Sequence, residues 1–257
     1  TLANAITRGT ASRGDVIGVG PGHAETITTT LTPIAGSYIV GLGWGRLRPV
    51  FTGSGAIDVF TISAANVVLR NIVAIGAAAD ATALLEISGA DAQFYGVELQ
   101  GAVTPSSIVT ISNATAVRPV FEDCIVRAAA GTAIIIDPQV TGACGQDMRI
   151  TNMYIHGSSV RDIDTSVIQS AKANCTGLII NGLYVVGIVA ADNPAGCFDF
   201  NSSTGLVDGM ITNVRFAFDG AITFAEANDA GGMLFVEVYG SDVASAKGTA
   251  WPAPTAT

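Results

Sequence analysis

The chain has 257 residues, of which 49% are hydrophobic, only 13% are charged and 30 are glycines, a composition that suits sheets and tight turns better than long surface helices. Its formal net charge of −9, with 12 lysines and arginines, argues against nucleic acid as a partner, because phosphate binding needs a concentrated basic face. No apolar run is long enough for a membrane span, so no membrane partner is expected either.

The first fourteen residues are expected to cap one end of the molecule. Leu2 and Ile6 are four positions apart, as on one face of a short helix, and residues 13–15 then turn the chain into a first strand over residues 16–19. Stacked strands leave an open sheet end that an amphipathic plug can cover. We therefore predict a short capping helix within residues 1–14.

A short pattern of alternating apolar residues recurs seven times between residues 66 and 240. Six copies place a turn-forming residue at the same point, at intervals of 25 to 31 positions: Asn71, Gly96, Asp123, Asn152, Gly182 and Asn213. Period-2 alternation indicates strands, and a repeat of this length indicates a solenoid. One such repeat cannot bury its apolar face without a neighbour stacked on it.

A second set of apolar strands advances with the first. Ile62, Ile87 and Ile111 are 25 and 24 positions apart, so each repeat contributes at least two strands to one coil. We therefore predict an all-β fold, a parallel β-helix of about eight to nine coils, with residues 1–240 forming a single domain. Residues 241–257 lose the periodicity and are expected to form an extended or partly disordered tail.

The opening coil carries a more particular motif. Arg-Gly-Asp at residues 13–15 leads into an apolar strand that ends in Pro-Gly-His-Ala-Glu-Thr at residues 21–26. This pattern resembles the first coil of right-handed parallel β-helix proteins with the pectate-lyase-like fold. Together with residues 39–43 and 48–49, it is similar to β-helix virion structural proteins of tailed bacteriophages. The resemblance implies a right-handed β-helix behind the capping helix.

The resemblance also carries functional expectations. It implies a non-enzymatic virion structural protein, first of all a capsid decoration, capsid-stabilising or head-fibre protein. Such a protein would be made in the host cytoplasm, contact the major capsid protein or other virion proteins at the capsid surface, and work as a homotrimer. The alternative is a tail-associated, tailspike-like protein that binds or depolymerises glycans. A secreted bacterial β-helix adhesin is a third reading.

Glycan hydrolysis would need two carboxyl groups that face one groove, roughly 5 to 9.5 Å apart. For that alternative, the candidates are Glu98 with Asp123, and Asp199 with Asp219 or Glu226. Asp123, however, occupies the recurring turn position, where short polar side chains bond nearby backbone. Glu98 alternates with apolar neighbours, as an outward-facing strand residue would. We therefore assign no catalytic residue from the sequence.

We expect no cofactor and no metal. The acidic pair Asp162 and Asp164 alone is a weak calcium signal, since calcium sites need about six to eight ligands. His23 and His156 have no nucleophile beside them in a recognisable motif and are interpreted as structural. Without a CxxC pair, the cysteines are expected to be buried, reduced thiols: Cys124, Cys144, Cys175 and Cys197.

Aromatic residues recur at one position of the predicted strands. Tyr154, Tyr184 and Tyr239 share this position, and Arg215 occupies it in the intervening copy. We interpret the row as a stacked surface ladder that stabilises successive coils rather than as a glycan-binding strip. Partner contacts are expected on the longest irregular insertions, which are residues 137–147, 157–165 and 190–196.

Overall fold

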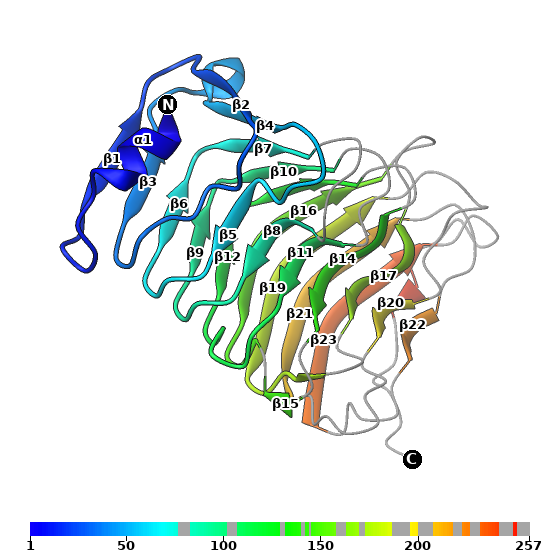
Figure 1. The fold of residues 1–257 in the computed structure, drawn as a ribbon. Coiled ribbons are helices and arrows are strands. Elements are labelled where there is room, and N and C mark those ends of the chain that lie inside the picture. The colour runs from blue at the N-terminus through cyan, green and yellow to red at the C-terminus, as the bar shows by residue number, and fades with distance from the viewer. Residues whose placement is uncertain are drawn as a thin grey trace.

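The protein is a parallel β-helix in which three sheets wind along one axis (Figure 1). The computed structural model describes residues 1–76, 83–101, 107–128, 132–139, 142–143, 145–157, 163–169, 173–186, 196–199, 208–217, 223–226, 232–241 and 249–250. The predicted all-β class, with coils stacked in parallel behind one short N-terminal helix, is confirmed.

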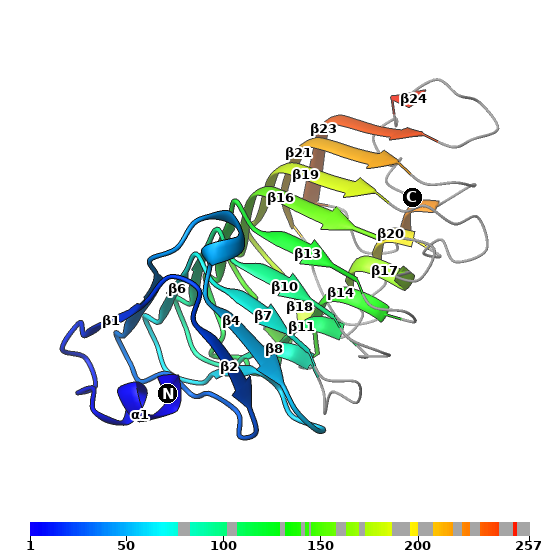
Figure 2. The same ribbon diagram turned by 90° about the horizontal axis from the view of Figure 1, so that it is seen from above.

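Sheets 1 and 2 are adjacent and share four long strands. Sheet 1 contains β1 (Val16–Val19), β3 (Tyr38–Gly41), β6 (Val68–Arg70), β9 (Gln93–Tyr95) and β12 (Val120–Glu122). Sheet 2 contains β2 (Ala24–Ile27), β4 (Val50–Gly53), β7 (Val73–Ile75), β10 (Glu98–Gln100) and β13 (Ile125–Arg127). The shared strands begin in sheet 1 and end in sheet 2, and they are β16 (Arg149–His156), β19 (Leu178–Val186), β21 (Asp208–Ala217) and β23 (Gly232–Ser241). Figure 2 shows the sheet 2 strands stacked in order.

Sheet 3 closes the coil. It contains β5 (Phe60–Ile62), β8 (Ala83–Ile87), β11 (Ser107–Ile111), β14 (Thr132–Pro138), β17 (Ile163–Gln169), β20 (Gly196–Asp199) and β22 (Thr223–Glu226). Sheet 3 thus has seven strands, whereas eight to nine coils were expected. The number of complete coils is lower than expected because a complete coil must contribute a strand to all three sheets. Between β2 and β3, for example, only Leu31 bridges to Phe60. A small two-stranded sheet pairs β15 (Gly142–Ala143) with β18 (Ala173–Asn174).

The core is the apolar interior of the coils. The middle residues of the sheet 1 strands point inward and lie above one another in register, as Leu69, Phe94, Phe121 and Ile150 do. All four are at most 1% exposed, and the Phe94 and Phe121 rings stack with centroids 4.9 Å apart. Equivalent positions bury equivalent apolar residues, which explains the alternation in the sequence.

Sheets 1 and 2 meet at the recurring turn position. Asn71, Asp123 and Asn152 have φ values of 54°, 54° and 50° there, in the left-handed region that short polar residues and glycine tolerate. The amide of Asp123 donates to the carbonyl of Thr151 on the next coil at 3.0 Å, so the turn continues the ladder of hydrogen bonds. The interpretation of Asp123 as a turn residue is confirmed.

The helix α1 (Leu2–Thr7) covers the first coil beside β1 (Figure 1). Leu2 and Ile6 are buried, as the spacing predicted, and the amide of Leu2 donates to Glu25 at 2.8 Å. None of the described helices has the length and apolar character that a membrane crossing requires. Of the expected tail, the structure describes only Ser241 at the end of β23 and β24 (Thr249–Ala250), which pairs antiparallel with β23. The single-domain division stays a prediction.

Candidate functional site

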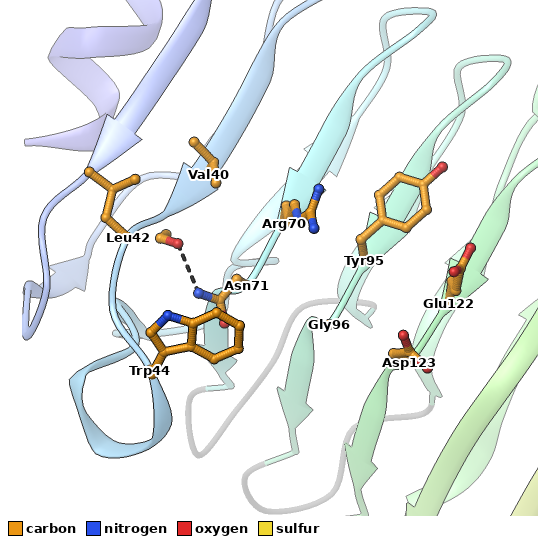
Figure 3. A pocket seen from close by; sticks show the side chains of 10 residues that line it. Val40, Leu42, Trp44, Arg70, Asn71, Tyr95, Gly96, Glu122 and Asp123 are labelled. Atoms are coloured by element: carbon orange, nitrogen blue, oxygen red, sulfur yellow. Dashed lines mark hydrogen bonds between the residues drawn. The ribbon is translucent and has the colours of Figure 1, made fainter.

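A cleft of about 650 Å³ lies on the outer face of sheet 1, near the N-terminal end of the solenoid (Figure 3). It extends across β3, β6, β9 and β12, and a loop formed by residues 42–48 stands at one end of it. The lining residues are Val40, Gly41, Leu42, Trp44, Arg70, Asn71, Tyr95, Gly96, Glu122 and Asp123.

One outward row of the sheet forms the floor of the cleft. Val40, Arg70, Tyr95 and Glu122 are paired in register on four successive strands, so their side chains follow one another at about 4.8 Å per coil. Figure 3 shows Arg70, Tyr95 and Glu122 projecting from neighbouring strands on the same face. The floor therefore combines a cation, an aromatic ring and a carboxylate in a straight line.

Two consecutive carboxylates line this cleft. Neighbouring residues of a strand normally point to opposite faces. Asp123 follows the last residue of β12 and has a φ of 54°, so the chain turns there. As a result both Glu122 and Asp123 are exposed to the same cleft. Strand alternation predicts that Glu122 and Asp123 point to opposite faces, so the two were not paired from the sequence. The recurring turn at Asp123 was the sequence feature that could have indicated a shared face.

Arg70 supplies the positive charge of the cleft. Its Nη1 donates to the hydroxyl of Tyr38 at 3.3 Å. This bond and the nearby Tyr95 and Glu122 raise the pKa of Arg70 above its ordinary value. The guanidinium therefore stays charged, two coils away from the carboxylates of Glu122 and Asp123.

Trp44 forms one end wall. It is 85% exposed, the largest exposed fraction among the large apolar residues of the described chain. Its loop is held by Asn71, whose Nδ2 donates to the carbonyls of Gly41 at 2.8 Å and Gly43 at 2.6 Å. A Cβ on Gly43 would lie 1.7 Å from the carbonyl oxygen of Leu47, so only glycine fits that position.

Glu98, the first carboxylate of the predicted pair, does not line the cleft with Asp123. It lies on β10 in sheet 2, where Arg48 binds one of its oxygens and Arg127 Nε donates to the other at 2.6 Å. Gln100 also donates to it, at 2.7 Å. Burial alone would raise the pKa of Glu98, but the bonds from Arg127, Arg48 and Gln100 outweigh that effect and hold the pKa below its usual range. Glu98 is therefore a fixed anion.

The second predicted pair lies near the other end of the solenoid. Asp199 ends β20 and is in register with Glu226, the last residue of β22, so these two backbone positions are on adjacent coils. The structure describes Asp199 and Glu226 by their backbone only. Asp219 lies outside the described residues, as do most of the two later insertions, residues 157–165 and 190–196.

Within the described ranges, no three side chains of His, Cys, Asp or Glu are grouped so that they could hold a metal ion. Cys124 and Cys175 are buried and form no disulfide, and burial raises the pKa of Cys124 to about 12. Cys144 lies outside the described residues. The two thiols that can be assessed are thus inert core groups.

The predicted aromatic ladder is present on sheet 2. Tyr154, Tyr184, Arg215 and Tyr239 are paired in register on β16, β19, β21 and β23. The Arg215 guanidinium carbon lies 5.0 Å from the centre of the Tyr239 ring, and Tyr154 stacks on His156 with ring centres 6.2 Å apart. The Arg215–Tyr239 contact joins two successive coils, as the interpretation of a stabilising row requires, whereas Tyr154 and His156 lie on the same strand.

No family model and no curated protein matches this chain. Among solved structures, it is similar to a pectin methylesterase variant in complex with a hexasaccharide, with a TM-score of 0.56 and 13% identity over 91% of this chain and 88% of that chain. The chain has the parallel β-helix fold of that enzyme. A second match, the catalytic unit of a thermostable GH87 α-1,3-glucanase from Streptomyces thermodiastaticus strain HF3-3, covers 94% of this chain and 65% of that chain at 13% identity. Its TM-score of 0.28 is too low to support an inference.

The comparison corrects one expectation. The sequence was read as that of a non-enzymatic protein because it offered no convincing catalytic carboxylate pair. The likeness to a pectin methylesterase contradicts that expectation, since a protein of the same fold is an enzyme. The sequence alternation also did not reveal the turn at Asp123, which brings the carboxylates of Glu122 and Asp123 into one cleft.

Proposed function

We propose that this protein binds an extended carbohydrate chain in the cleft on sheet 1. The observation that carries the proposal is the lining itself, in which exposed Trp44 stands beside a row formed by Arg70, Tyr95 and Glu122. Indole and phenol rings can stack on the apolar faces of sugar rings, while the charged groups can hydrogen-bond hydroxyls. A mostly concave surface with a few directed polar groups is typical of ligand sites.

The ligand class follows from the shape and charge of the cleft. The cleft runs along the solenoid axis, where equivalent positions repeat at about 4.8 Å, so it suits a linear polymer of repeated units. Its lining contains one guanidinium, from Arg70, and two carboxylates, from Glu122 and Asp123. A polyuronate would meet net repulsion there, so we expect a neutral glycan. The pectin methylesterase of the same fold, bound to a hexasaccharide, supports a β-helix as a platform for an oligosaccharide.

Hydrolysis of the bound chain is a second candidate function, favoured by Glu122 and Asp123 lining the same cleft. In such a reaction one carboxylic acid gives its proton to the leaving glycosidic oxygen. The other carboxylate takes a proton from the water that attacks the sugar carbon, or attacks that carbon itself. Both carboxyl groups are needed, so removal of either should abolish turnover while leaving binding partly intact.

The virion location, the capsid partner and the homotrimer remain proposals based on the sequence resemblance. Glycan binding in the cleft is compatible with the alternative expectation, a tail-associated protein that contacts host surface polysaccharide. Mass spectrometry of purified particles tests the location. Absence of the protein from every particle preparation would remove the virion proposal without affecting the cleft.

The experiment that tests binding is calorimetric titration with neutral oligosaccharides of increasing length, chosen from a glycan array. Trp44→Ala and Tyr95→Ala should each weaken binding by about tenfold. Tyr184→Ala is the matched control, because Tyr184 is a surface tyrosine on sheet 2 outside the cleft. The proposal fails if no glycan binds, or if the two cleft variants bind like the control.

The same oligosaccharides test cleavage. New reducing ends should form with the wild type and disappear with Glu122→Gln and with Asp123→Asn. Glu86→Gln, which changes a carboxylate on sheet 3, should retain full activity. If the wild type binds the oligosaccharide without cleaving it, the binding function stands and the hydrolysis proposal fails.

A further inference from the structure

The loop that carries Trp44 is held at both ends by side chains from later coils. At its start, Asn71 of the β6–β7 turn donates to the carbonyl of Gly41, which ends β3, and to that of Gly43 in the loop. At its end, Arg48 reaches past β7 to Glu98 on β10. Between these two points the loop exposes Leu42, Trp44 and Leu47, each by more than half of its surface. Three exposed apolar side chains would not by themselves keep the loop away from the sheet.

We infer that Glu98 is a positioning residue, which holds residues 42–48, and with them the Trp44 wall, in place through Arg48. This role rests on the proposed carbohydrate site, because Glu98 would position the Trp44 wall of that site. Glu98 was a candidate for catalysis by sequence, yet its side chain is only 5% exposed and both of its oxygens are already occupied by guanidinium groups. It therefore acts on the cleft only through other residues.

Burial makes the contact with Arg48 strong and directional. In the register of sheet 2, Glu98 lies between Val73 and Ile125, two apolar neighbours that keep water away from it. The Arg48 side chain is 19% exposed. A carboxylate in such surroundings needs its charged partners, since it cannot exchange them for water. Arg127 remains to compensate Glu98 when Arg48 is removed, so the two partners can be separated by mutation.

Backbone hydrogen bonds of the intervening turn couple the position of Trp44 to that of Arg48. The carbonyl of Trp44 accepts from the amide of Leu47 at 2.9 Å, which closes the 3₁₀ turn η1 (Gly45–Leu47). The carbonyl of Leu47 accepts from the amide of Gly22 at 2.7 Å. Because Arg48 directly follows this turn, fixing its side chain fixes the orientation of η1 and of the indole. Arg48 Nη1 also lies 3.5 Å from the carbonyl of Gly96, a residue of the cleft.

The test uses hydrogen exchange of the ligand-free protein. Glu98→Gln and Arg48→Gln should each speed exchange of the Leu47 and Arg48 amides by about tenfold, because the turn opens more often without its anchor. Exchange in β16 should stay unchanged. Glu86→Gln is the matched control, because Glu86 is a strand glutamate on sheet 3 whose side chain also has a hydrogen-bond partner, Ser112 at 2.5 Å. Unchanged exchange at residues 44–48 in both variants would overturn the inference.

Oligosaccharide affinity provides the second readout. Arg48→Gln keeps Glu98 paired with Arg127 and should fold, yet it should bind about tenfold more weakly than the wild type. In a Trp44→Ala background the same change should have no further effect, because the wall that it positions is already gone. Additive losses would contradict the inference. If the wild type binds no glycan, the proposed function fails, while the exchange experiment still decides the role of Glu98.

Discussion

Asp91 and Arg118 occupy the same turn position on adjacent coils, and both have left-handed φ values, 58° and 57°. The carboxylate accepts two hydrogen bonds from the guanidinium, at 2.6 and 2.7 Å. The backbone repeats the relationship, since each of the two amides donates to a carbonyl one coil further on. A solenoid thus joins its coils at the turns by side chains as well as by the strand ladder.

The ion pair predicts a dependence on salt and pH. The bonds from Arg118 hold the pKa of Asp91 below its usual range, so its contribution is present above the ordinary aspartate pKa and is lost as pH falls through the folded value. Asp91→Asn should lower the urea midpoint slightly at pH 7 and low salt. Because the pair is partly exposed, the difference should vanish near 1 M salt, where screening acts over about 3 Å. A difference that persists at high salt would mean that the amide perturbs the turn itself.

Glu98 should control a larger part of the acid stability. Its folded pKa is lowered, so its stabilising effect is complete above about pH 4.3, the ordinary glutamate value, and declines below it. Glu98→Gln should cost about 2 kcal/mol at pH 7, less than the loss of a fully buried pair because Arg127 is partly exposed. Urea unfolding from pH 3 to 7 measures both effects. The curves of wild type and variant should converge at low pH, and parallel curves would refute the prediction.

At the turn between sheets 1 and 2, glycine should be less destabilising than alanine, the reverse of their usual order inside a strand or helix. Asn152 has a φ of 50°, where a Cβ costs energy unless a short polar group compensates. Asn152→Ala should destabilise the protein by about 1 kcal/mol, whereas Asn152→Gly should be close to neutral. Chemical denaturation of the two variants provides the measurement. Equal losses would show that the bond from Asn152 to Asp123, at 3.3 Å, matters more than the backbone.

Gly43→Ala should damage the cleft rather than the solenoid. The added Cβ would lie 1.7 Å from the carbonyl oxygen of Leu47, so the loop must move. We expect a loss of about 1 to 3 kcal/mol in loop and global stability and a weaker affinity for oligosaccharide. Gly20→Ala is the control, because a Cβ there meets no atom within 4 Å. Thermal unfolding and titration distinguish the two, and identical behaviour would disprove the assigned constraint.

The repeat, the alternation and the position of the turn can all be recognised in the amino-acid sequence. These properties are local, because a strand shows its buried face in every second residue and a left-handed turn restricts the residue that occupies it. Asn71 and Asp123 could therefore be recognised as equivalent before their φ values were known. The aromatic row of sheet 2 could be aligned in the same way.

Which side chains from different coils meet depends on how the coils stack in three dimensions. The repeats vary between 25 and 31 residues, so spacing in sequence does not state which side chains share a cleft. Arg48 and Glu98 are 50 positions apart and meet across β7, while Glu122 and Asp123 are neighbours that alternation would have separated. The stacking of coils brings the first pair together, and one left-handed residue unites the second, because register and backbone turns are properties of the assembled solenoid.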